Sequence, residues 1–307
     1  MTHDLRNIRI RDPFILHLPS RSTYYLFGTT DDQPWTGPGT GFDCYTSSDM
    51  QNWDGPVSAF RPPLHFWGTT QFWAPEVYEY DGSFFMFATF ADDHGHRGTQ
   101  VLKADEPTGQ YLPWSDGPVT PADWACLDGT LYIDKAGRPW MVFCHEWLQI
   151  NDGAMYAQRL TPDLKTATGL PVFLFNASEA AWSTPLPGGS TQAPNYVTDG
   201  PFLKKTDTGE LVMLWSSHGK DGYAMGLARS RNGAIEGPWD HDPEPLWAED
   251  GGHGMFFHPS PDQTILVFHH PNDLPNERTT MIEITGFGTR ALIEENPPKA
   301  LTDTATL

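Results

Sequence analysis

Cysteine, basic residues and long apolar segments are all scarce in this sequence of 307 residues. The three cysteines, Cys44, Cys126 and Cys144, are odd in number and include no CxxC pair, so they indicate neither a disulfide framework nor a zinc site. No run of about 18 apolar residues is present, which excludes a transmembrane segment. Because the first residues lack the apolar core of a signal peptide, we expect a cytoplasmic protein, or a secreted or periplasmic one whose leader has been removed.

Positive charge is the second shortage, with 19 Lys and Arg residues against 39 Asp and Glu residues and a formal net charge of −20. The acidic residues are spread along the chain, and no basic run interrupts them. Nucleic acids and anionic membranes are therefore excluded as partners. Solubility accounts for most of this acidity, and composition leaves the oligomeric state open.

Glycine, proline and aromatic residues are plentiful, as expected for short strands joined by tight turns. One pattern occurs five times: a polar residue at a Gly or Pro corner, a strand, a turn and a second strand. The copies begin near Asp12, Glu76, Asp128, Asp199 and His253. A strand repeat of roughly this length is typical of propeller blades. We predict an all-β, five-bladed β-propeller that forms a single domain over residues 1–307.

Propeller geometry would turn these scattered positions into one site, because the innermost strand of every blade starts on the same face, near the axis. Four carboxylates and one histidine would converge there. The second strand of each hairpin runs back to that face. It would bring to the rim Thr29, Thr30, Phe90, Glu146, Trp147, His218, His269 and His270.

The remaining segments are predicted to close the ring and wall the site. Ile8-Arg-Ile-Arg11 alternates in polarity, as expected for an edge strand or for the segment that closes the ring. Long loops at residues 31–44, 61–73 and 176–197 would make the central funnel a pocket. Aromatic residues that could stack on a sugar, or pack between blades instead, are Trp35, Phe66, Trp67, Trp73, Trp147 and Trp182.

Carboxyl groups at the starts of different inner strands suit the hydrolysis of a glycosidic bond with inversion. That reaction needs a protonated acid and an ionised base roughly 6.5–9.5 Å apart, a spacing that a small funnel provides. A third acid between them would raise the pKa of the donor by like-charge repulsion.

Three motifs resemble glycoside hydrolase family 43, the inverting five-bladed propellers. Arg11-Asp12-Pro-Phe-Ile resembles the motif of the general base, and Leu127-Asp128-Gly that of the acid that orients and tunes the donor. Trp73-Ala-Pro-Glu76-Val resembles the second-blade motif. The resemblance covers nearly the whole chain and implies a glycosidase. Since the long loops would close the funnel into a pocket, we predict an exo-acting enzyme that releases terminal α-L-arabinofuranosyl residues from plant polysaccharide side chains or oligosaccharides.

The fourth blade departs from the family pattern. Where the family has a glutamate before Gly-Pro as general acid, this chain has Asp199. Its shorter side chain withdraws the proton by more than about 1 Å. We predict Asp199 as the donor, with Glu146 as its rival and Glu76 as a more distant one.

The resemblance also implies roles around the catalytic acids. Arg278 would face the carboxylates and keep Asp12 ionised. His253 would help to hold a central hydrated cation, commonly calcium, although a hydrogen-bonded structural histidine is the alternative. No organic cofactor is expected. Glu76 would bind substrate hydroxyls or neighbouring backbone. The other predicted substrate-binding residues are Trp73, Trp147, Phe90, His218 and His270.

Other functions remain open on the same scaffold. β-D-xylosidases and exo-β-galactosidases share the family, and a carbohydrate-binding propeller without turnover would fit the missing fourth-blade glutamate. A retaining fructoside hydrolase would need a nucleophile about 5 Å from the acid. Its Asn-Asp-Pro-like motif is absent, because Arg11 precedes Asp12.

Overall fold

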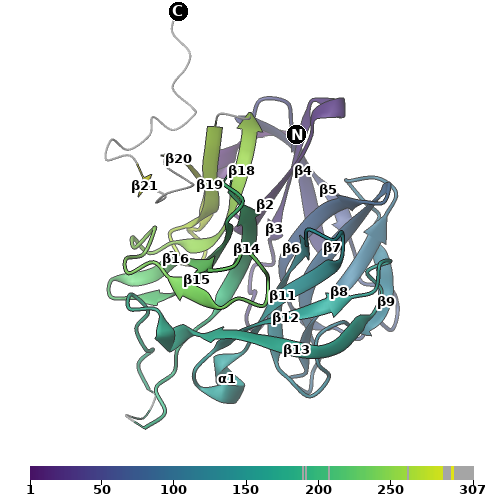
Figure 1. Cartoon of the computed structure of the whole chain (residues 1–307). Helices are drawn as coiled ribbons and strands as arrows, with labels where there is room; N and C mark the ends of the chain where they lie inside the picture. Colours follow the sequence, from purple (N-terminus) through teal and green to yellow (C-terminus); the bar gives the residue numbers. More distant parts are fainter. Residues whose placement is uncertain (189, 191, 207, 261–262, 286–291, 294–307) are drawn as a thin grey trace, which may run out of the picture.

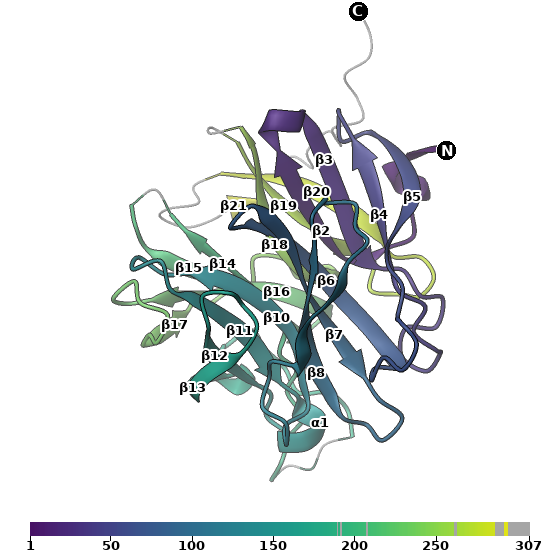
Figure 2. The ribbon, with the colours of Figure 1, turned by 90° about the vertical axis from the view of Figure 1, so that its right-hand side faces the viewer.

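A computed structural model describes residues 1–285 and 292–293, except residues 189, 191, 207, 261 and 262. This part of the chain forms five antiparallel sheets in chain order, which confirms the predicted five-bladed β-propeller (Figure 1). Figure 2, turned by 90°, shows the sheets as separate blades that follow one another in sequence colour. No helix in the described ranges has the length and apolar character needed to cross a membrane.

Each sheet is a meander whose first strand is innermost, and the first sheet gains an extra outer strand from the N-terminus. The first sheet contains β1 (Thr2–Asp4), β2 (Arg11–Leu18), β3 (Thr23–Thr29), β4 (Phe42–Ser47) and β5 (Asn52–Phe60). The second contains β6 (Thr70–Tyr80), β7 (Ser83–Ala91), β8 (Arg97–Ala104) and β9 (Leu112–Pro118). The third contains β10 (Cys126–Ile133), β11 (Pro139–His145), β12 (Ala154–Leu160) and β13 (Ala167–Asn176).

The last two sheets repeat this arrangement. The fourth contains β14 (Asp199–Lys205), β15 (Leu211–Gly219), β16 (Gly222–Ser230) and β17 (Trp239–His241). The fifth contains β18 (Gly252–Ser260), β19 (Gln263–His270), β20 (Arg278–Thr285) and β21 (Leu292–Ile293). Helix is confined to α1 (Trp147–Ile150) and the 3-10 turns η1 (Leu5–Asn7), η2 (Pro19–Arg21) and η3 (Ala177–Glu179) in the described residues.

The hairpin of the second blade illustrates why these residues form strands. In β7, eight of nine residues are buried, because this middle strand packs on both faces. The two-residue turn before it is Asp81-Gly82, with φ of 47° and 72°. Asp-Gly is favoured in such turns because both central residues need positive φ. The turn pairs Tyr80 with Ser83 and sets the register of the blade.

Ring closure rests on hydrophobic packing between blades. In the described part of the chain, each of the five buried clusters joins two neighbouring sheets, including the first and the fifth. The cluster between the first and fifth sheets contains Ile8 and Ile10 from the lead-in segment together with Met255 and Ile265. Burying both faces of every sheet in this way removes the apolar surface that an open ring would expose.

The lead-in segment Ile8–Arg11 has the ring-closing role predicted as one of its two alternatives. Arg9 forms an antiparallel bridge with Arg278 of β20, while Ile8 and Ile10 are buried. The edge strand lies earlier in the chain, where β1 pairs with β5. The N-terminus therefore both extends the first blade and joins it to the last.

Replacing Ile10 tests this closure. Ile10 has no exposed surface, so Ile10→Ala should lower the free energy of unfolding by about 2–5 kcal/mol, because it removes buried methyl groups and leaves a cavity. Urea denaturation followed by tryptophan fluorescence would measure this change. Leu170→Ala is the matched control, since Leu170 is 88% exposed and its loss should change stability by less than about 0.5 kcal/mol. Equal stability of both variants would contradict ring closure through this cluster.

A bulge near the start of each inner strand defines which residues are equivalent in the five blades. The second residue of each bulge has a positive φ, near 50°. These residues are Asp12, Ala74, Asp128, Gly200 and His253. The predicted alignment of the repeats is therefore corrected at two positions. Glu76 lies two residues after the positive-φ position of its strand, and Asp199 lies one residue before that position in its own strand.

Candidate active site

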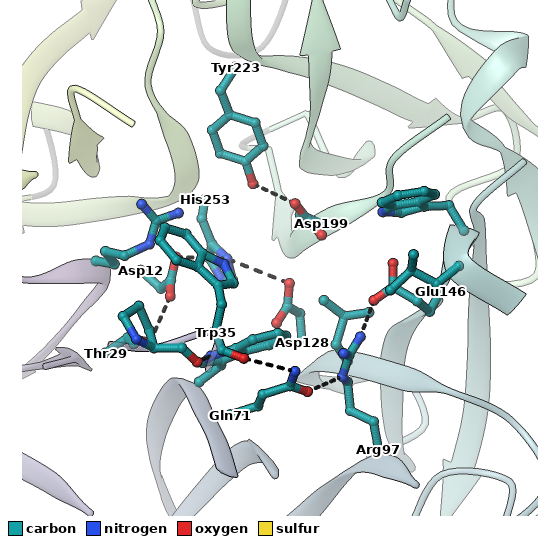
Figure 3. Close-up of a pocket in the computed structure, with 16 residues that line it drawn as sticks. Asp12, Thr29, Trp35, Gln71, Arg97, Asp128, Glu146, Asp199, Tyr223 and His253 are labelled. Carbon is teal, nitrogen blue, oxygen red and sulfur yellow. Dashed lines mark hydrogen bonds and ion pairs between the residues drawn. The ribbon is translucent and has the colours of Figure 1, made fainter. Parts of the chain in front are cut away.

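The bulges surround a cavity of about 370 Å³ at the face where the inner strands begin. Figure 3 shows Asp12, Asp128, Asp199 and Glu146 directed into it from three different sheets. The conformation of the bulge is what turns the side chains of Asp12 and Asp128 toward the axis, and Asp tolerates positive φ better than most residues. Residues remote in sequence thus share one pocket.

Asp12 lies between hydrogen-bond donors and positive charge. Its Oδ2 accepts a hydrogen bond from Thr29 Oγ1 at 2.7 Å, and its Oδ1 lies 3.3 Å from His253 Nδ1. Burial works to raise the pKa of Asp12, but His253, His269, Arg11 and the Thr29 hydrogen bond outweigh it, and the pKa lies below its usual value. Asp12 is therefore ionised at neutral pH, as a general base must be.

His269 helps to position Asp12 as a neutral ring. The backbone N–H of Asp12 donates to His269 Nδ1 at 3.2 Å, so the proton of the ring lies on Nε2, which is 3.2 Å from Asn272 Oδ1. Burial and the charge of Arg11 lower the pKa of His269 to about 3. The permanent positive charge beside Asp12 consequently comes from Arg11.

Asp128 and Asp199 form a buried pair of carboxyl groups. Burial raises the pKa of each to about 8, and the charge of Asp12 on Asp128 and of Asp128 on Asp199 adds to this. Asp128 Oδ2 accepts the N–H of Gly200 at 3.0 Å, and Asp199 Oδ2 accepts the hydroxyl of Tyr223 at 3.0 Å. Once one carboxyl is ionised, its charge holds a proton on the other, so the pair carries one proton near neutral pH.

Glu146 has a different environment, because it is ion-paired with Arg97. Burial raises the pKa of Glu146 above its usual value, although the charge of Arg97 works in the opposite direction. Arg97 Nε also donates to Gln71 Oε1 at 2.8 Å, and its guanidinium lies 4.8 Å from the ring centre of Trp73 (Figure 3). The carboxylate is occupied by its ion pair with Arg97, which argues for a structural part in the pocket wall rather than proton donation.

Removing Arg97 should destabilise the protein. Both partners of the ion pair are at least nine-tenths buried, so Arg97→Met should cost about 3–5 kcal/mol by leaving Glu146 without a counter-charge. Thermal unfolding would measure the loss. The double variant Arg97→Met with Glu146→Gln should recover part of it, because no unpaired charge remains. A double variant no more stable than the single one would contradict this account.

Seven of the predicted site residues line the cavity. They are Asp12, Asp128, Asp199, Glu146, Trp73, Trp147 and His253. Of the predicted aromatic walls, Trp35 also lines it, whereas Phe66, Trp67 and Trp182 pack against hydrophobic clusters between blades. The alternative of packing between blades therefore holds for three of the six aromatic residues.

Two predicted substrate contacts are corrected because their side chains are buried elsewhere. Phe90 has no exposed surface and packs edge-on against Phe72, with ring centres 4.8 Å apart. Glu76 lies deeper along its inner strand, where Tyr78 donates to its Oε2 at 2.5 Å. Burial raises the pKa of Glu76 to about 7. Glu76 thus belongs to the interior of the ring and not to the pocket wall.

Three further predicted contacts also lie outside the residues found to line the cavity. The ring of His218 packs 5.7 Å from that of Tyr223, and the ring of His270 packs 5.6 Å from that of Trp247. The guanidinium of Arg278 donates to backbone carbonyls, including that of Arg6 at 3.0 Å. Arg278 therefore joins the last blade to the N-terminal segment, and it does not face the carboxylates as predicted.

Sequence reasoning missed four polar residues that line the cavity: Arg11, Gln71, Arg97 and Tyr223. Arg11 takes the place expected for Arg278, because it stands next to Asp12 in the chain. Arg97 and Tyr223 lie at the start of the third strand in their blades, paired with the end of the second. The rule that second strands end at the site face could have found them, since a third strand begins where the second ends.

A directly coordinated metal does not fit these residues. No group of three or more His, Cys, Asp or Glu side chains in the described ranges is arranged to hold a metal ion. His253 Nδ1 lies 3.3 Å from Asp12 Oδ1 and 3.6 Å from Asp128 Oδ2. His253 therefore has carboxylate partners of its own, and the calcium ion expected from the resemblance stays a prediction.

Comparison with known proteins gives consistent matches. A sequence profile of the glycosyl hydrolases family 43 matches residues 5–288. The solved endo-arabinase from Bacteroides thetaiotaomicron is 41% identical, with a TM-score of 0.83, and the match covers 91% of this chain and 95% of that one. A thermostable family-43 glycoside hydrolase, 22% identical, has a TM-score of 0.78 and 96% coverage of both chains.

A curated protein also matches over part of its length. The extracellular endo-alpha-(1->5)-L-arabinanase 1 of Bacillus subtilis (strain 168) is 26% identical over an alignment of 151 residues, and the match covers 43% of this chain and 44% of that protein. The match thus spans less than half of that relative.

Proposed function

Because this chain belongs to the glycosyl hydrolases family 43, whose enzymes invert the anomeric carbon, we propose that it cleaves α-L-arabinofuranosyl linkages within arabinan chains. The observation that supports the proposal is that the cavity contains both an ionised carboxylate and a protonated carboxyl group. Asp12 is held ionised, while the Asp128–Asp199 pair retains a proton. An inverting hydrolase needs one group of each kind.

In the proposed reaction, Asp12 removes a proton from water on one side of the sugar ring. The Thr29 hydroxyl donates to Oδ2 of Asp12 and thereby fixes the orientation of the carboxylate. Asp199 protonates the departing glycosidic oxygen on the other side. Asp128 keeps that proton on Asp199 by like-charge repulsion. The C–O bond to the leaving sugar breaks as the bond to water oxygen forms, so the product has the inverted configuration.

The substrate and the position of cleavage are inferred from two observations. The 41% identity with an endo-arabinase favours cleavage within an arabinan backbone over the exo-acting removal of terminal residues. Of the three loops expected to wall the pocket, residues 31–44 and 61–73 contribute Trp35 and Trp73 to the lining. The described residues of 176–197 are not among those that line the cavity.

Product analysis on linear α-1,5-arabinan tests the proposal. Endo cleavage would lower viscosity early and yield mixed oligosaccharides, whereas an exo enzyme would release arabinose alone from the start. Proton NMR of the first product should show the β anomer from the α linkage. Nitrophenyl β-xyloside and β-galactoside serve as controls for the other activities of the scaffold. Binding of arabino-oligosaccharides without any cleavage would favour a carbohydrate-binding propeller instead.

The pH dependence of the reaction should reflect the two protonation states. Since the pKa of Asp199 is raised to about 8, the donor is competent below that value and loses its proton above it. Since the pKa of Asp12 is lowered from 3.8, the base fails only below about pH 4. The value of kcat/KM should therefore be level from roughly pH 5 to 7 and fall above about pH 8. An alkaline limb near pH 5 would contradict the assignment of a buried donor.

A further inference from the structure

The bulge of each blade is tied to the preceding blade by its backbone N–H. In four of the five described junctions, the acceptor is a side chain of the preceding blade, and it always stands at the same position. This position is the residue of the second strand that pairs with the first bulge residue of its own blade. The bonds are Ala74 N–H to Thr29 Oγ1 (2.9 Å), Asp128 N–H to Thr89 Oγ1 (2.8 Å), His253 N–H to Ser216 Oγ (2.8 Å) and Asp12 N–H to His269 Nδ1 (3.2 Å).

The junction between the third and fourth blades differs. The equivalent position there is Cys144, which pairs with Leu127 and is fully buried. Its Sγ lies 3.8 Å from the sulfur of Met155, and a thiol is a weak acceptor. The N–H of the next bulge, that of Gly200, donates to Asp128 Oδ2 instead.

We propose that Cys144 is a positioning residue for the catalytic pair: by withholding an acceptor from the Gly200 N–H, it reserves this N–H for the carboxylate of Asp128. The bond ties Asp128 to the backbone beside Asp199. This role rests on the proposed function of these two acids, and it concerns how they are held rather than which substrate they act on.

The first blade shows what a hydroxyl would do at this position. Thr29 Oγ1 accepts the N–H of Ala74 and also donates to Asp12 Oδ2, so a hydroxyl stands between the next bulge and the carboxylate. A serine at position 144 would interpose itself in the same way between Gly200 and Asp128. The carboxylate would then lose its direct bond to the fourth blade, and that N–H favours the ionised form of Asp128.

The thiol of Cys144 takes no part in proton transfer to the substrate. Burial raises the pKa of Cys144, and the charges of Asp128 and Asp199 add to the effect. The group is therefore a neutral thiol at neutral pH. Its contribution is the absence of a competing acceptor, a property that alanine shares and serine does not. This difference provides a matched pair of substitutions.

Two variants at position 144 test the inference. Cys144→Ser should lower kcat on arabino-oligosaccharides by about tenfold with KM within about twofold, because the displaced Asp128 supports proton donation less well. Cys144→Ala, which has no acceptor, should keep kcat within about twofold of the wild type. Equal losses in both variants would identify a packing effect and overturn the proposal.

A spectroscopic comparison keeps the test independent of activity. The amide resonance of Gly200, observed in glycine-labelled protein, should shift on Asp128→Asn in the wild-type background and in Cys144→Ala. In the Cys144→Ser background the same substitution should shift it much less, because the N–H then bonds to the serine hydroxyl. A similar shift in all three backgrounds would overturn the proposal. If no substrate is cleaved but the amide pattern holds, only the proposed function fails.

Discussion

Asp12→Asn should reduce kcat by roughly 10²- to 10⁴-fold, which is the usual contribution of a positioned acid or base. The amide cannot accept a proton from water, yet it keeps the size of the side chain and can still accept the Thr29 hydrogen bond. KM should change little, because substrate binding depends on the surrounding walls. Initial rates on arabinan and arabino-oligosaccharides would measure the loss.

Backbone strain is the main competing explanation for such a loss, and a matched variant removes it. Asp12 has φ of 50°, and Asp81, in an exposed turn, has φ of 47°. Asp81→Asn therefore makes the same chemical change in the same backbone region, away from the cavity. It should leave both kcat and the unfolding temperature unchanged. Wild-type rates in Asp12→Asn would exclude Asp12 as the base and leave the proposed reaction without one.

The fold could be predicted because each blade repeats its local pattern. The Gly and Pro corners, the apolar second strands and the Gly turns all report local conformation, which the sequence encodes directly. The five-bladed ring follows from their number. The extra strand β1 could not be predicted from the sequence, because Thr2–Asp4 shows no hydrophobic alternation and pairs with β5 through the backbone.

The register of the repeat was harder to predict, because the bulge is recognised by its positive φ, and different residue types occupy this position in the five blades. Asp12, Asp128 and His253 occupy the bulge in three blades, but Ala74 and Gly200 occupy it in the other two. Aligning the blades by their polar residues therefore placed Glu76 at the pocket although it lies inside the ring. A shift of two residues along one strand decides whether Glu76 lies in the pocket or inside the ring, and this shift could be seen only in the structure.

Long side chains were the second source of error. Arg278 was predicted to face the carboxylates, but its guanidinium reaches the carbonyl of Arg6. Arg97, from the second blade, reaches Glu146 in the third. Sequence position fixes where such a side chain begins, whereas its flexible stem and its partners decide where the charge ends. The short acids Asp12, Asp128 and Asp199 were predictable for the same reason.

Asp199→Asn should be the second variant with a large effect, and the effect should depend on the leaving group. On arabino-oligosaccharides, whose leaving oxygen must be protonated, we expect a loss of roughly 10²- to 10⁴-fold. On a nitrophenyl arabinofuranoside, which leaves without help, the loss should stay below about tenfold. The alkaline limb near pH 8 should also disappear, because the group that titrates there is gone.

Glu146→Gln is the decisive comparison, because Glu146 is the other acid predicted as a donor and it lines the same cavity. Glu146 is occupied by its ion pair with Arg97 in the pocket wall, so this variant should lower the rates on both substrates by a similar, smaller factor. The hydroxyl of Tyr223 and the charge of Asp128 act on Asp199 instead, and they place its proton where a leaving oxygen can receive it. If Glu146→Gln lost activity mainly on the poor leaving group while Asp199→Asn lost it equally on both, the donor would be Glu146, and Asp199 would serve only to orient it.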